Sequence, residues 1–323
     1  MEIRIREIES SMIYIANNSH DPYYNQAFEE YIYENYKEGT IVLLWRNNPA
    51  VVCGCHQNIF AEVNVIKAHA QGVSIVRRIT GGGTVFHDLG NLNYTIISDK
   101  DSKMLDYTKY MDFMINILRK LAIPVSLNRT SDIVIDGLKI SGSAQKITKN
   151  RVLHHGTLLY NSDLKTLSSL TKGQRSYYET KGIPSVPWPV TNIIDHMESP
   201  LVKTQEFGEM ILEAVKQGSN WETMVLSPEE DDQIKRLAEE KYKSWEWTYG
   251  NSPAFTYNRS FELEGIPMSV SYQAKHGIIT QFSIDPNEPD LEEALCGKKL
   301  SVHDIRQKLL SFPKLSNLYK YLF

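Results

Sequence analysis

The stretch Val76-Arg-Arg-Ile-Thr-Gly-Gly-Gly-Thr-Val-Phe-His-Asp-Leu-Gly-Asn91 decides the fold of this chain, and three consecutive glycines, Gly81 to Gly83, lie at its centre. Glycine has no Cβ atom, so a ligand can lie directly against the backbone N–H groups of such a segment. Arg77 and Arg78 precede the glycines, and a guanidinium group pairs with a carboxylate or phosphate in bidentate fashion without losing its charge. The stretch therefore predicts a loop that suits an anion.

The flanks of the glycines favour a sheet rather than a helix. Residues 84–86 and 92–97 have the apolar and β-branched character of strands, so the loop is anchored between strands. A Gly-Lys-Ser/Thr sequence does not follow the glycines, and a G-x-G-x-x-G sequence is absent, so neither of the common nucleotide-binding helix motifs applies. On this stretch alone, a plain glycine-rich turn between strands is an equally good interpretation.

A second segment favours a functional loop over a plain turn: Asp132-Ile-Val-Ile-Asp-Gly-Leu-Lys-Ile-Ser-Gly-Ser143. Asp136-Gly137 stands between two alternating apolar runs, which is a strong signal for a two-residue β-hairpin. Lys139 follows two residues after the turn, and Ser141 is expected on the same side of the strand. A lysine fixed on a strand beside a tight turn can be aimed at a substrate.

These motifs, together with His154-His-Gly-Thr-Leu-Leu159, resemble those of the lipoate–protein ligase A family, of the bacterial type with a C-terminal accessory domain. The similar segments are 77–91, 136–144 and 154–159, and they occur in the order and at the spacing of that family. Residues 245–253 resemble the start of its small C-terminal domain. The residue patterns by themselves indicate only an α+β protein that handles acyl groups or phosphate.

The resemblance implies an α+β fold with two domains. A catalytic domain of the biotin/lipoate ligase type, with a large mixed or antiparallel sheet, is expected at residues 1–245. A small α+β accessory domain is expected at residues 246–323. The length of 323 residues agrees, because it exceeds what a single hydrophobic core usually holds.

Composition excludes several classes of protein. Hydrophobic residues make up 41% and charged residues 23%, as in ordinary globular proteins, and the net charge of −4 is too mild to indicate nucleic-acid binding. Three cysteines argue against a disulfide framework and for a reducing compartment. Residues 1–15 lack the pattern of a signal peptide, and apolar runs stay shorter than the roughly 18 residues of a membrane helix. We expect a cytoplasmic monomer that does not associate with membranes.

Periodicity and turn residues predict the following elements. Strands are expected at residues 3–8, 12–15, 41–45, 50–53 and 152–159, in addition to those flanking the glycine loop. Helices are expected from Pro22, with Asp21 as N-cap, and at residues 107–121, 204–215 and 228–245. The C-terminal part is expected to contain strands at 255–264, 268–274 and 278–284 and a helix at 302–310. The strand at 152–159 is expected to form a meander with the Lys139 hairpin, which would place His154 or His155 near the lysine.

The resemblance implies an enzyme that activates lipoate with ATP and Mg²⁺ to lipoyl-AMP, releases pyrophosphate and transfers the lipoyl group to a lysine of a lipoyl-domain protein. The acceptors would be E2 subunits of 2-oxoacid dehydrogenases or the H protein of glycine cleavage. Lipoate and octanoate are both candidate acids, and no tightly bound prosthetic group is expected. Lys139 is the catalytic candidate, because a cation between the carboxylate and the α-phosphate offsets the repulsion of two anions.

The remaining site residues follow from the same resemblance. The segment expected to bind ATP and the adenylate, together with Lys139, comprises Arg77, Gly82, Gly83, Thr84 and Val85. Asp132 is a candidate to orient Lys139 or to hold magnesium, and His155 is given a supporting role. The full set of secondary candidates comprises Arg78, His87, Asp88, Asn91, Asp132, Ser141 and His155.

The chain departs from the family pattern at two places. Cys55 stands where a basic residue is common, and Pro187-Trp-Pro189 replaces a serine-containing segment. The prolines fix φ and remove donors, so this loop is expected to be stiff and extended. These departures leave open whether the adenylation half-reaction is intact. A catalytic or metal-binding role for Cys53, Cys55 and His56 is the less favoured interpretation, because strand neighbours point to opposite faces and free cysteine packs as a small hydrophobe.

Three other functions stay open at this point. An acyltransferase that moves octanoyl or lipoyl groups without ATP would use a cysteine nucleophile or a preformed lipoyl-adenylate. None of the three cysteines lies between Lys139 and Leu159, where such a nucleophile is expected. A biotin ligase shares the fold type but has a different glycine-rich loop. A non-catalytic lipoate- or nucleotide-binding protein would need the pocket but not the lysine.

Overall fold

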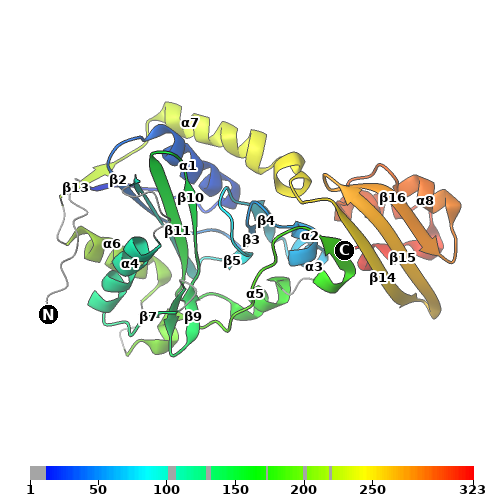
Figure 1. The fold of residues 1–323 in the computed structure, drawn as a ribbon, viewed down its shortest axis with the longest axis horizontal. Coiled ribbons are helices and arrows are strands. Elements are labelled where there is room, and N and C mark those ends of the chain that lie inside the picture. The colour runs from blue at the N-terminus through cyan, green and yellow to red at the C-terminus, as the bar shows by residue number, and fades with distance from the viewer. Residues whose placement is uncertain (1–11, 101–106, 129–131, 172–173, 199–201, 218–219) are drawn as a thin grey trace. The chain divides into compact units, whose positions relative to one another are not determined.

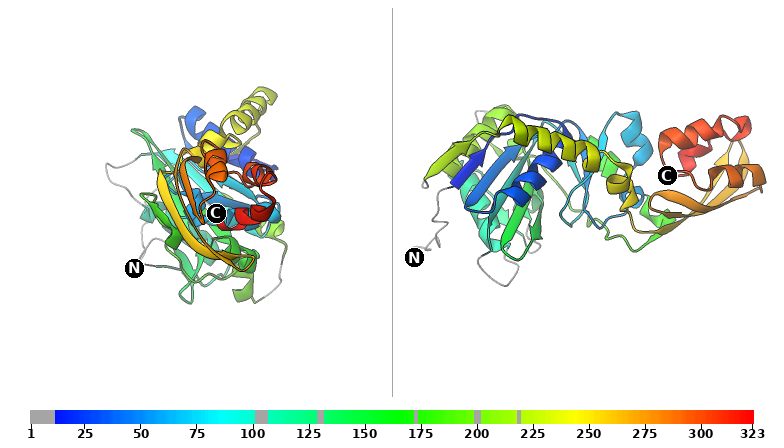
Figure 2. Two further views of the ribbon diagram at one scale, coloured as in Figure 1. Left: turned by 90° about the vertical axis from the view of Figure 1, so that its right-hand side faces the viewer. Right: turned by 90° about the horizontal axis from the view of Figure 1, so that it is seen from above.

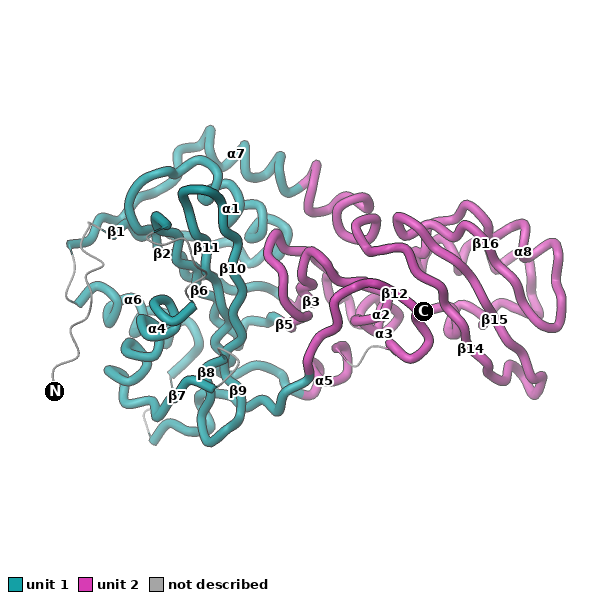
Figure 3. The backbone as a smooth tube through the Cα atoms, viewed as in Figure 1, with its two compact units in different colours: residues 1–48, 87–164, 187–238 teal, residues 49–86, 165–186, 239–323 magenta. Residues whose placement is uncertain are grey.

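The computed structural model describes residues 12–100, 107–128, 132–171, 174–198, 202–217 and 220–323. The strand expected at residues 3–8 lies outside these residues. The chain forms two compact units, coloured separately in Figure 3. Unit 1 comprises residues 1–48, 87–164 and 187–238, and unit 2 comprises residues 49–86, 165–186 and 239–323. The division into domains at residue 245 stays a prediction, and each unit is described by itself below.

Unit 1 is built on a six-stranded mixed sheet with the strand order β10-β11-β6-β2-β1-β13. Its strands are β1 (Met12–Ile15), β2 (Thr40–Trp45), β6 (Asn91–Asp99), β10 (Ser143–Ile147), β11 (Arg151–Leu159) and β13 (Trp221–Met224). The neighbours β10, β11, β6 and β2 pair in antiparallel fashion, whereas β1 is parallel to both β2 and β13. Every residue of β2 and β11 is buried, so both faces of this sheet are covered (Figure 1).

One face of the sheet packs against α1 (Pro22–Asn35), which begins as the sequence predicts: the carboxylate of Asp21 accepts a hydrogen bond from the N–H of Tyr23. α7 (Pro228–Leu237) lies along α1, as Figure 2 shows. Two tyrosine hydroxyls join the helices: Tyr24 of α1 donates to Asp231 at 2.6 Å, and Tyr36, the C-cap residue of α1, donates to Glu230 at 2.7 Å. The two hydrogen bonds hold α7 against the helix that covers the sheet.

The other face packs against α4 (Thr108–Lys120) and α6 (Thr204–Lys216), which enclose the main apolar core of the unit. The unit also contains the 3₁₀ helix η2 (Ile193–His196) and a small sheet of β7 (Ser126–Leu127), β8 (Ile133–Ile135) and β9 (Leu138–Ser141). The helix α5 (Leu164–Thr171) begins in unit 1 with Leu164, and its other residues belong to unit 2.

Unit 2 holds two sheets. The first has the order β4-β3-β5 and consists of β3 (Ala50–Cys53), β4 (Ser74–Arg77) and β5 (Val85–His87), at whose end the chain enters unit 1. The second is antiparallel and consists of β12 (Tyr178–Thr180), β14 (Phe255–Leu263), β15 (Ile266–Lys275) and β16 (Ile278–Asp285). Its α-helices are α2 (Ile59–Glu62), α3 (Val65–Ala70), α8 (Pro289–Leu295) and α9 (Val302–Leu309). Its 3₁₀ and π turns are η1 (Arg175–Tyr177), η3 (Ala238–Tyr242, of which Ala238 belongs to unit 1), η4 (Glu246–Gly250), η5 (Pro313–Leu315) and η6 (Leu318–Tyr321).

The structure confirms the mixed α+β fold class and has a counterpart for each predicted helix or strand that lies in the described residues. The strands β4, β7, β10, β12 and β13 were not predicted. Three differences have physical causes. The helix predicted at 228–245 is α-helical only to Leu237 and continues in π turns. The short helices α2, α3, α5 and α8 are too brief to show a helical period. The predicted meander is wrong, because β9 belongs to a different sheet and β10 intervenes before β11.

Within the residues that the structure describes, we find no helix with both the length and the apolar character needed to cross a bilayer.

Steric crowding explains why a glycine, Gly156, stands in the His-His-Gly-Thr segment. A Cβ atom on Gly156 would lie 2.5 Å from the hydroxyl of Tyr94 and 2.6–2.7 Å from its ring, and Tyr94 is fully buried and cannot move away. We therefore predict that Gly156→Ala lowers the free energy of unfolding by about 1–3 kcal/mol, as overpacking usually does. Urea unfolding measures this change.

Gly208→Ala is the matched control, because a Cβ there makes an ordinary 3.5 Å contact with Leu92 in the middle of α6. A helical glycine replaced by alanine gains up to about 1 kcal/mol. Equal stability of Gly156→Ala and the wild type would show that the strand tolerates a side chain and contradict the packing described here.

Candidate active site

Lys139 lies on β9 directly after a tight turn. Asp136 and Gly137 have φ values of 50° and 78°, as a type I′ turn requires, so the predicted hairpin is confirmed. The Nζ atom of Lys139 lies 3.0 Å from Oδ1 of Asp132, and the two side chains are 25% and 16% exposed. The end of the lysine side chain also lies over Gly142, where an added Cβ would come within 2.9 Å of Nζ. The charged end of Lys139 is thus held by a carboxylate and a glycine while staying open to solvent.

The predicted alternation of side chains along β9 does not hold. The pairing with β8 shifts between Ile133 and Val134, so Lys139 and Ser141 oppose consecutive residues of the partner strand. Such a bulge breaks the period of two. Ile140 and Ser141 are consequently both fully buried, whereas Lys139 is not. Ser141 was expected on the same side of the strand as Lys139, but it is buried and does not share the exposed position of the lysine.

The proline-containing segment packs against the strand of Lys139. The N–H of Lys139 donates to the carbonyl of Pro189 at 2.8 Å, and its carbonyl accepts from Thr191 at 3.1 Å. Trp188, 43% exposed, donates from its indole to the carbonyl of Gly137 at 3.2 Å. Both backbone groups of Lys139 are therefore satisfied by a segment that proline makes stiff. The departure from the family pattern has a structural role at the catalytic candidate.

In unit 2, Arg78 holds the glycine loop in shape. Its side chain donates to the carbonyls of Gly81 at 2.6 Å, Gly83 at 2.8 Å and Val52 at 3.1 Å. The side chain is only 5% exposed. With its carbonyls drawn towards Arg78, the loop takes up a fixed conformation in which Gly82 has a φ of 87°. Arg78 thus contributes positive charge beneath the loop and hydrogen bonds to its backbone.

Arg77 is fully buried and binds protein carbonyls. Its Nη1 donates to the carbonyls of Gly54, Cys55 and Gln57, and its Nε donates to those of Trp247 and Thr248. Burial lowers the pKa of the guanidinium, because it disfavours the charged form. These contacts tie β4 to the turn after β3 and to η4. They give Arg77 a structural role, and its assignment to ATP binding stays a prediction.

Thr84, in the predicted ATP-binding segment, forms hydrogen bonds through both its backbone N–H and its hydroxyl. Its N–H donates to Oγ of Ser185 at 2.9 Å, and its hydroxyl donates to Oε1 of Gln57 at 3.0 Å. The backbone of the turn after β3 lies against the loop as well, since a Cβ on Gly54 would fall 2.2 Å from the carbonyl of Gly82. Gly82 and Gly83 lie in this loop, and Val85 begins β5. An anion that binds the N–H of Thr84 must displace Ser185.

Three candidates after the loop make structural contacts in unit 1. Nδ1 of His87 lies 3.0 Å from Nδ2 of Asn47, its ring meets Trp45 edge-on, and it is 3% exposed. The carboxylate of Asp88 accepts from the N–H groups of Gly90 at 2.9 Å and Asp163 at 2.7 Å. Asn91 is fully buried and donates to Oδ1 of Asn93 at 2.9 Å. These residues fix the chain where it enters β6.

A buried carboxylate that the sequence analysis missed lies under His155. Glu29 on α1 is fully buried, and its Oε1 and Oε2 lie 2.8 and 3.0 Å from Nδ1 of His155. Thr95 donates to Oε1 at 2.6 Å and accepts from Nε1 of Trp45 at 3.2 Å. In the sequence Glu29 looks like any other helical glutamate. The one available signal was its position on the apolar face of α1, where a charged residue is unusual.

The neighbouring His154 is buried on the opposite face of β11. Its ring stacks on Tyr110 with the centroids 4.9 Å apart and the planes within 9°. Nδ1 lies 3.0 Å from Nε2 of Gln145. Burial, followed by the charge of His155, lowers the pKa of His154 to about 3. His154 is therefore a neutral packing residue.

The cysteines and acidic residues offer little for other chemistry. Burial raises the pKa of Cys53, which keeps the thiol protonated and inert. Cys55 is half-buried, and its N–H donates to the carbonyl of Thr80 at 2.9 Å. Among the residues with described positions, no three His, Cys, Asp or Glu side chains are grouped as metal ligands would be.

Comparisons with family models, curated proteins and solved structures all point to the same family. The lipoyl protein ligase A/B catalytic domain model matches residues 21–216. Lipoate–protein ligase 1 of Staphylococcus aureus is 33% identical over 319 residues, which cover 96% of each protein. A T. acidophilum protein solved with bound lipoic acid is 25% identical with a TM-score of 0.60, over 74% of this chain and 99% of that one. A lipoate-protein ligase A solved with ATP is similar at 25% identity and a TM-score of 0.60, over 75% of this chain and 99% of that one.

The lowered pKa of His154 predicts a pH-dependent stability. Below pH 6.5 the unfolded chain binds a proton at this residue, and the folded chain does not until about pH 3. The stability is therefore fully present above pH 6.5 and falls as the pH drops towards 3. The phenyl ring of His154→Phe keeps the stacking on Tyr110 and does not titrate. As the pH drops through this window, the free energy of unfolding of the variant should therefore fall less steeply than that of the wild type, by up to about 1.4 kcal/mol per pH unit. Urea unfolding at several pH values measures both slopes, and identical slopes would contradict the prediction.

Proposed function

Because the chain belongs to the lipoate–protein ligase family and is an enzyme of that type, we propose that it joins lipoate to ATP before transfer. In this reaction the carboxylate of lipoate attacks the α-phosphate, pyrophosphate leaves, and the lipoyl group of lipoyl-AMP passes to a lysine of a lipoyl-domain protein. The observation that carries the proposal is the fixed ammonium group of Lys139, with its backbone satisfied on both sides and its Nζ held 3.0 Å from Asp132.

Lys139 would act through charge. The carboxylate and the α-phosphate are both anions, so their approach is opposed by repulsion that grows as water is excluded. An ammonium group between them offsets this repulsion and follows the negative charge as it moves onto the leaving pyrophosphate. A preorganised donor of this kind contributes about 3 kcal/mol or more to the transition state. Asp132 orients the lysine for this role.

The glycine loop would bind the nucleotide. The backbone N–H groups of Gly82, Gly83, Thr84 and Val85 would bind the phosphates, that of Thr84 after Ser185 is displaced, and Arg78 places a positive charge beside the loop. The fixed conformation of the loop lowers the entropy lost when the phosphates bind. The ATP-bound and lipoic-acid-bound relatives support the choice of both substrates.

Magnesium would enter with the nucleotide. Mg²⁺ keeps several waters and usually needs only one or two protein carboxylates beside the phosphates. Asp132 fits such a limited role, since it is partly exposed and lies beside Lys139. When bound, the ion would offset phosphate charge.

We propose E2 subunits and the H protein as acceptors, and lipoate or octanoate as the acid, with the protein acting as a cytoplasmic monomer. Membership of the family supports the acceptors and the acids. The three cysteines, too few for a disulfide framework, support the compartment. The three assignments can be tested separately from the chemistry of activation.

A second candidate function is transfer from a preformed lipoyl-adenylate without activation. It is favoured by Pro187-Trp188-Pro189, which replaces a segment with donor side chains. The cysteine-dependent form of this transfer is disfavoured, because Cys53 is held as a thiol. Both forms lack ATP-dependent pyrophosphate release, which distinguishes them from the ligase reaction.

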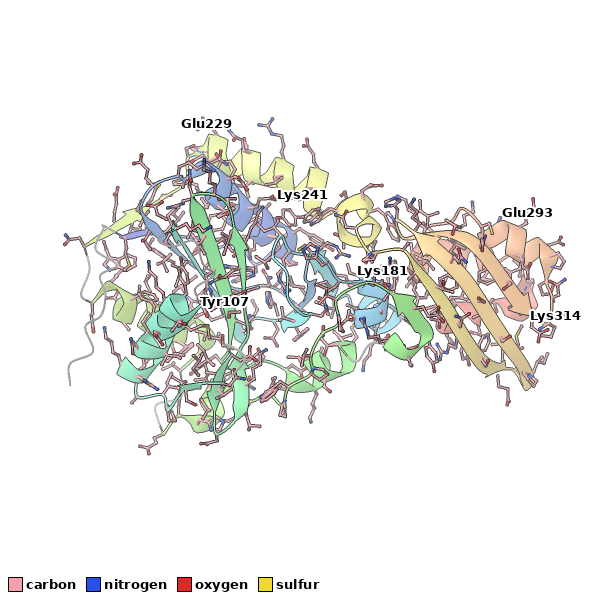
Figure 4. All side chains as sticks on the ribbon, in the orientation of Figure 1. Tyr107, Lys181, Glu229, Lys241, Glu293 and Lys314 are labelled. Atoms are coloured by element: carbon pink, nitrogen blue, oxygen red, sulfur yellow. The ribbon has the colours of Figure 1, made fainter. Side chains whose placement is uncertain are left out.

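Replacing Lys139 by leucine tests the proposed role. Lys139→Leu should retain most lipoate binding while lipoate-dependent exchange between pyrophosphate and ATP falls by about 100-fold or more, the loss expected for about 3 kcal/mol of transition-state stabilisation. Lys314→Leu is the matched control, on an exposed residue labelled in Figure 4. Unchanged exchange in Lys139→Leu would contradict the mechanism.

A further inference from the structure

We propose that Trp188 is a positioning residue for Lys139: its indole N–H holds the hairpin turn that carries the lysine, and so helps to fix where the ammonium group lies. This inference rests on the proposed function, in which Lys139 is the catalytic cation, and adds a residue that acts through it. Trp188 and the hairpin both belong to unit 1.

The hydrogen bond of Trp188 falls on the part of the hairpin that its own ladder does not hold. The ladder ends at the pair of Ile135 and Leu138, so the peptide groups of the turn residues Asp136 and Gly137 lie outside it. A carbonyl outside the ladder needs a donor from elsewhere in the protein or from water. Nε1 of Trp188 donates to the carbonyl of Gly137 at 3.2 Å. The indole is therefore bonded to the turn just before the catalytic candidate.

Two prolines restrict the backbone from which the indole extends. Pro187 and Pro189 have fixed φ angles, and a residue that precedes a proline, as Trp188 does, is restricted to extended backbone conformations. The side chain of Trp188 therefore leaves the backbone in a direction that the sequence limits. Because the unfolded segment has few conformations to lose, little entropy opposes the hydrogen bond.

The same segment contacts the hairpin at its strand and at its turn. A parallel bridge joins Val190 to Lys139, beside the two backbone hydrogen bonds of the lysine. Further along the chain, Nε2 of His196 lies 3.0 Å from the hydroxyl of Thr191, and its Nδ1 lies 3.9 Å from Oδ2 of Asp136. The backbone bonds hold the strand at the lysine, and the indole holds the turn that precedes it.

Burial does not explain why a tryptophan stands at position 188. All five tryptophans of the chain lie in the described residues, and Trp45 is buried while Trp221, Trp245 and Trp247 are half-buried. Trp188, by contrast, is 43% exposed. An indole that keeps so much of its surface in water contributes less to a hydrophobic core than a buried one. Its hydrogen bond to the turn is the better-supported reason for its presence.

The turn matters because it joins the two arms that hold the ammonium group. Asp132 precedes β8 and Lys139 lies on β9, so the 3.0 Å contact between their side chains spans the hairpin. Asp136 has a φ of 50°, a conformation that is strained for a residue other than glycine, so the turn gains from an external bond. Displacement of a catalytic group by a fraction of a bond length slows a reaction.

The test is lipoate-dependent exchange between pyrophosphate and ATP in Trp188→Phe, which keeps an aromatic ring and removes the N–H. A hydrogen bond can bias the turn by no more than its own net free energy, so kcat should fall by about 3- to 10-fold. The KM values of ATP and lipoate should be unchanged. Benzothienylalanine at position 188, which keeps the shape of the indole and has sulfur in place of the N–H, should give the same loss.

Trp221→Phe is the matched control. Nε1 of Trp221 is buried and has no hydrogen-bond partner among the residues that the structure describes, so its removal breaks no such bond. This variant should exchange pyrophosphate at the rate of the wild type.

A double-mutant cycle separates positioning from packing. If Trp188 acts through Lys139, Trp188→Phe should cause no further loss in the Lys139→Leu variant. An equal fold-loss in both backgrounds would overturn the inference, as would an unchanged kcat in Trp188→Phe or a rise in KM alone. A loss confined to transfer from lipoyl-AMP to the acceptor would also overturn it, and would indicate that the exposed indole contacts the acceptor.

Failure of this inference is distinguishable from failure of the proposed function. Lipoate-dependent exchange that is equally fast in the wild type and in Trp188→Phe refutes only the role of Trp188. A wild-type protein without lipoate-dependent exchange contradicts the proposed function, and the inference with it.

Discussion

A buried carboxylate constrains the centre of unit 1. Glu29 has no contact with water, so its charge must be satisfied by donors from the sheet, and Thr95 and His155 supply them from neighbouring strands. The register of β6 and β11 places those two residues opposite each other. The same register places Gly156 opposite Tyr94. On the other edge of β11, Thr157 is hydrogen-bonded to Gly142, and the side chain of Lys139 lies over that glycine. The strand that pairs beside the buried carboxylate therefore also supports the residue under the catalytic candidate.

Unit 2 satisfies its buried charges in a different way. Arg77 and Arg78 are both removed from solvent, and both donate to backbone carbonyls and hydroxyls of their own unit. Carbonyls stabilise a guanidinium without neutralising it, so the positive charge of Arg78 persists beneath the glycine loop. The loop can then attract an anion while its shape is already fixed. Two adjacent arginines thus divide the work, with Arg77 joining β4 to η4 and Arg78 shaping the loop.

Local signals in the sequence predict most of the fold. The Asp136-Gly137 turn, the Asp21 cap and the alternation of the C-terminal strands depend on neighbours in the chain and are found as expected. The carbonyl partners of Arg77 and the Glu29–His155 pair join residues that are distant in sequence. No local pattern specifies such contacts. For the candidate site, the sequence therefore predicts which residues are special, such as Lys139 and Asp132, and the fold supplies their partners.

Activation of lipoate by ATP is the central claim. Its most direct measurement is pyrophosphate release from ATP by the full chain with Mg²⁺, with and without lipoate, followed by the intact mass of a lipoyl-domain acceptor. The account predicts pyrophosphate only when lipoate is present and a gain of one lipoyl group on the acceptor. The absence of lipoate-dependent pyrophosphate, with the acceptor still modified by added lipoyl-AMP, would contradict the account and identify a transferase without activation.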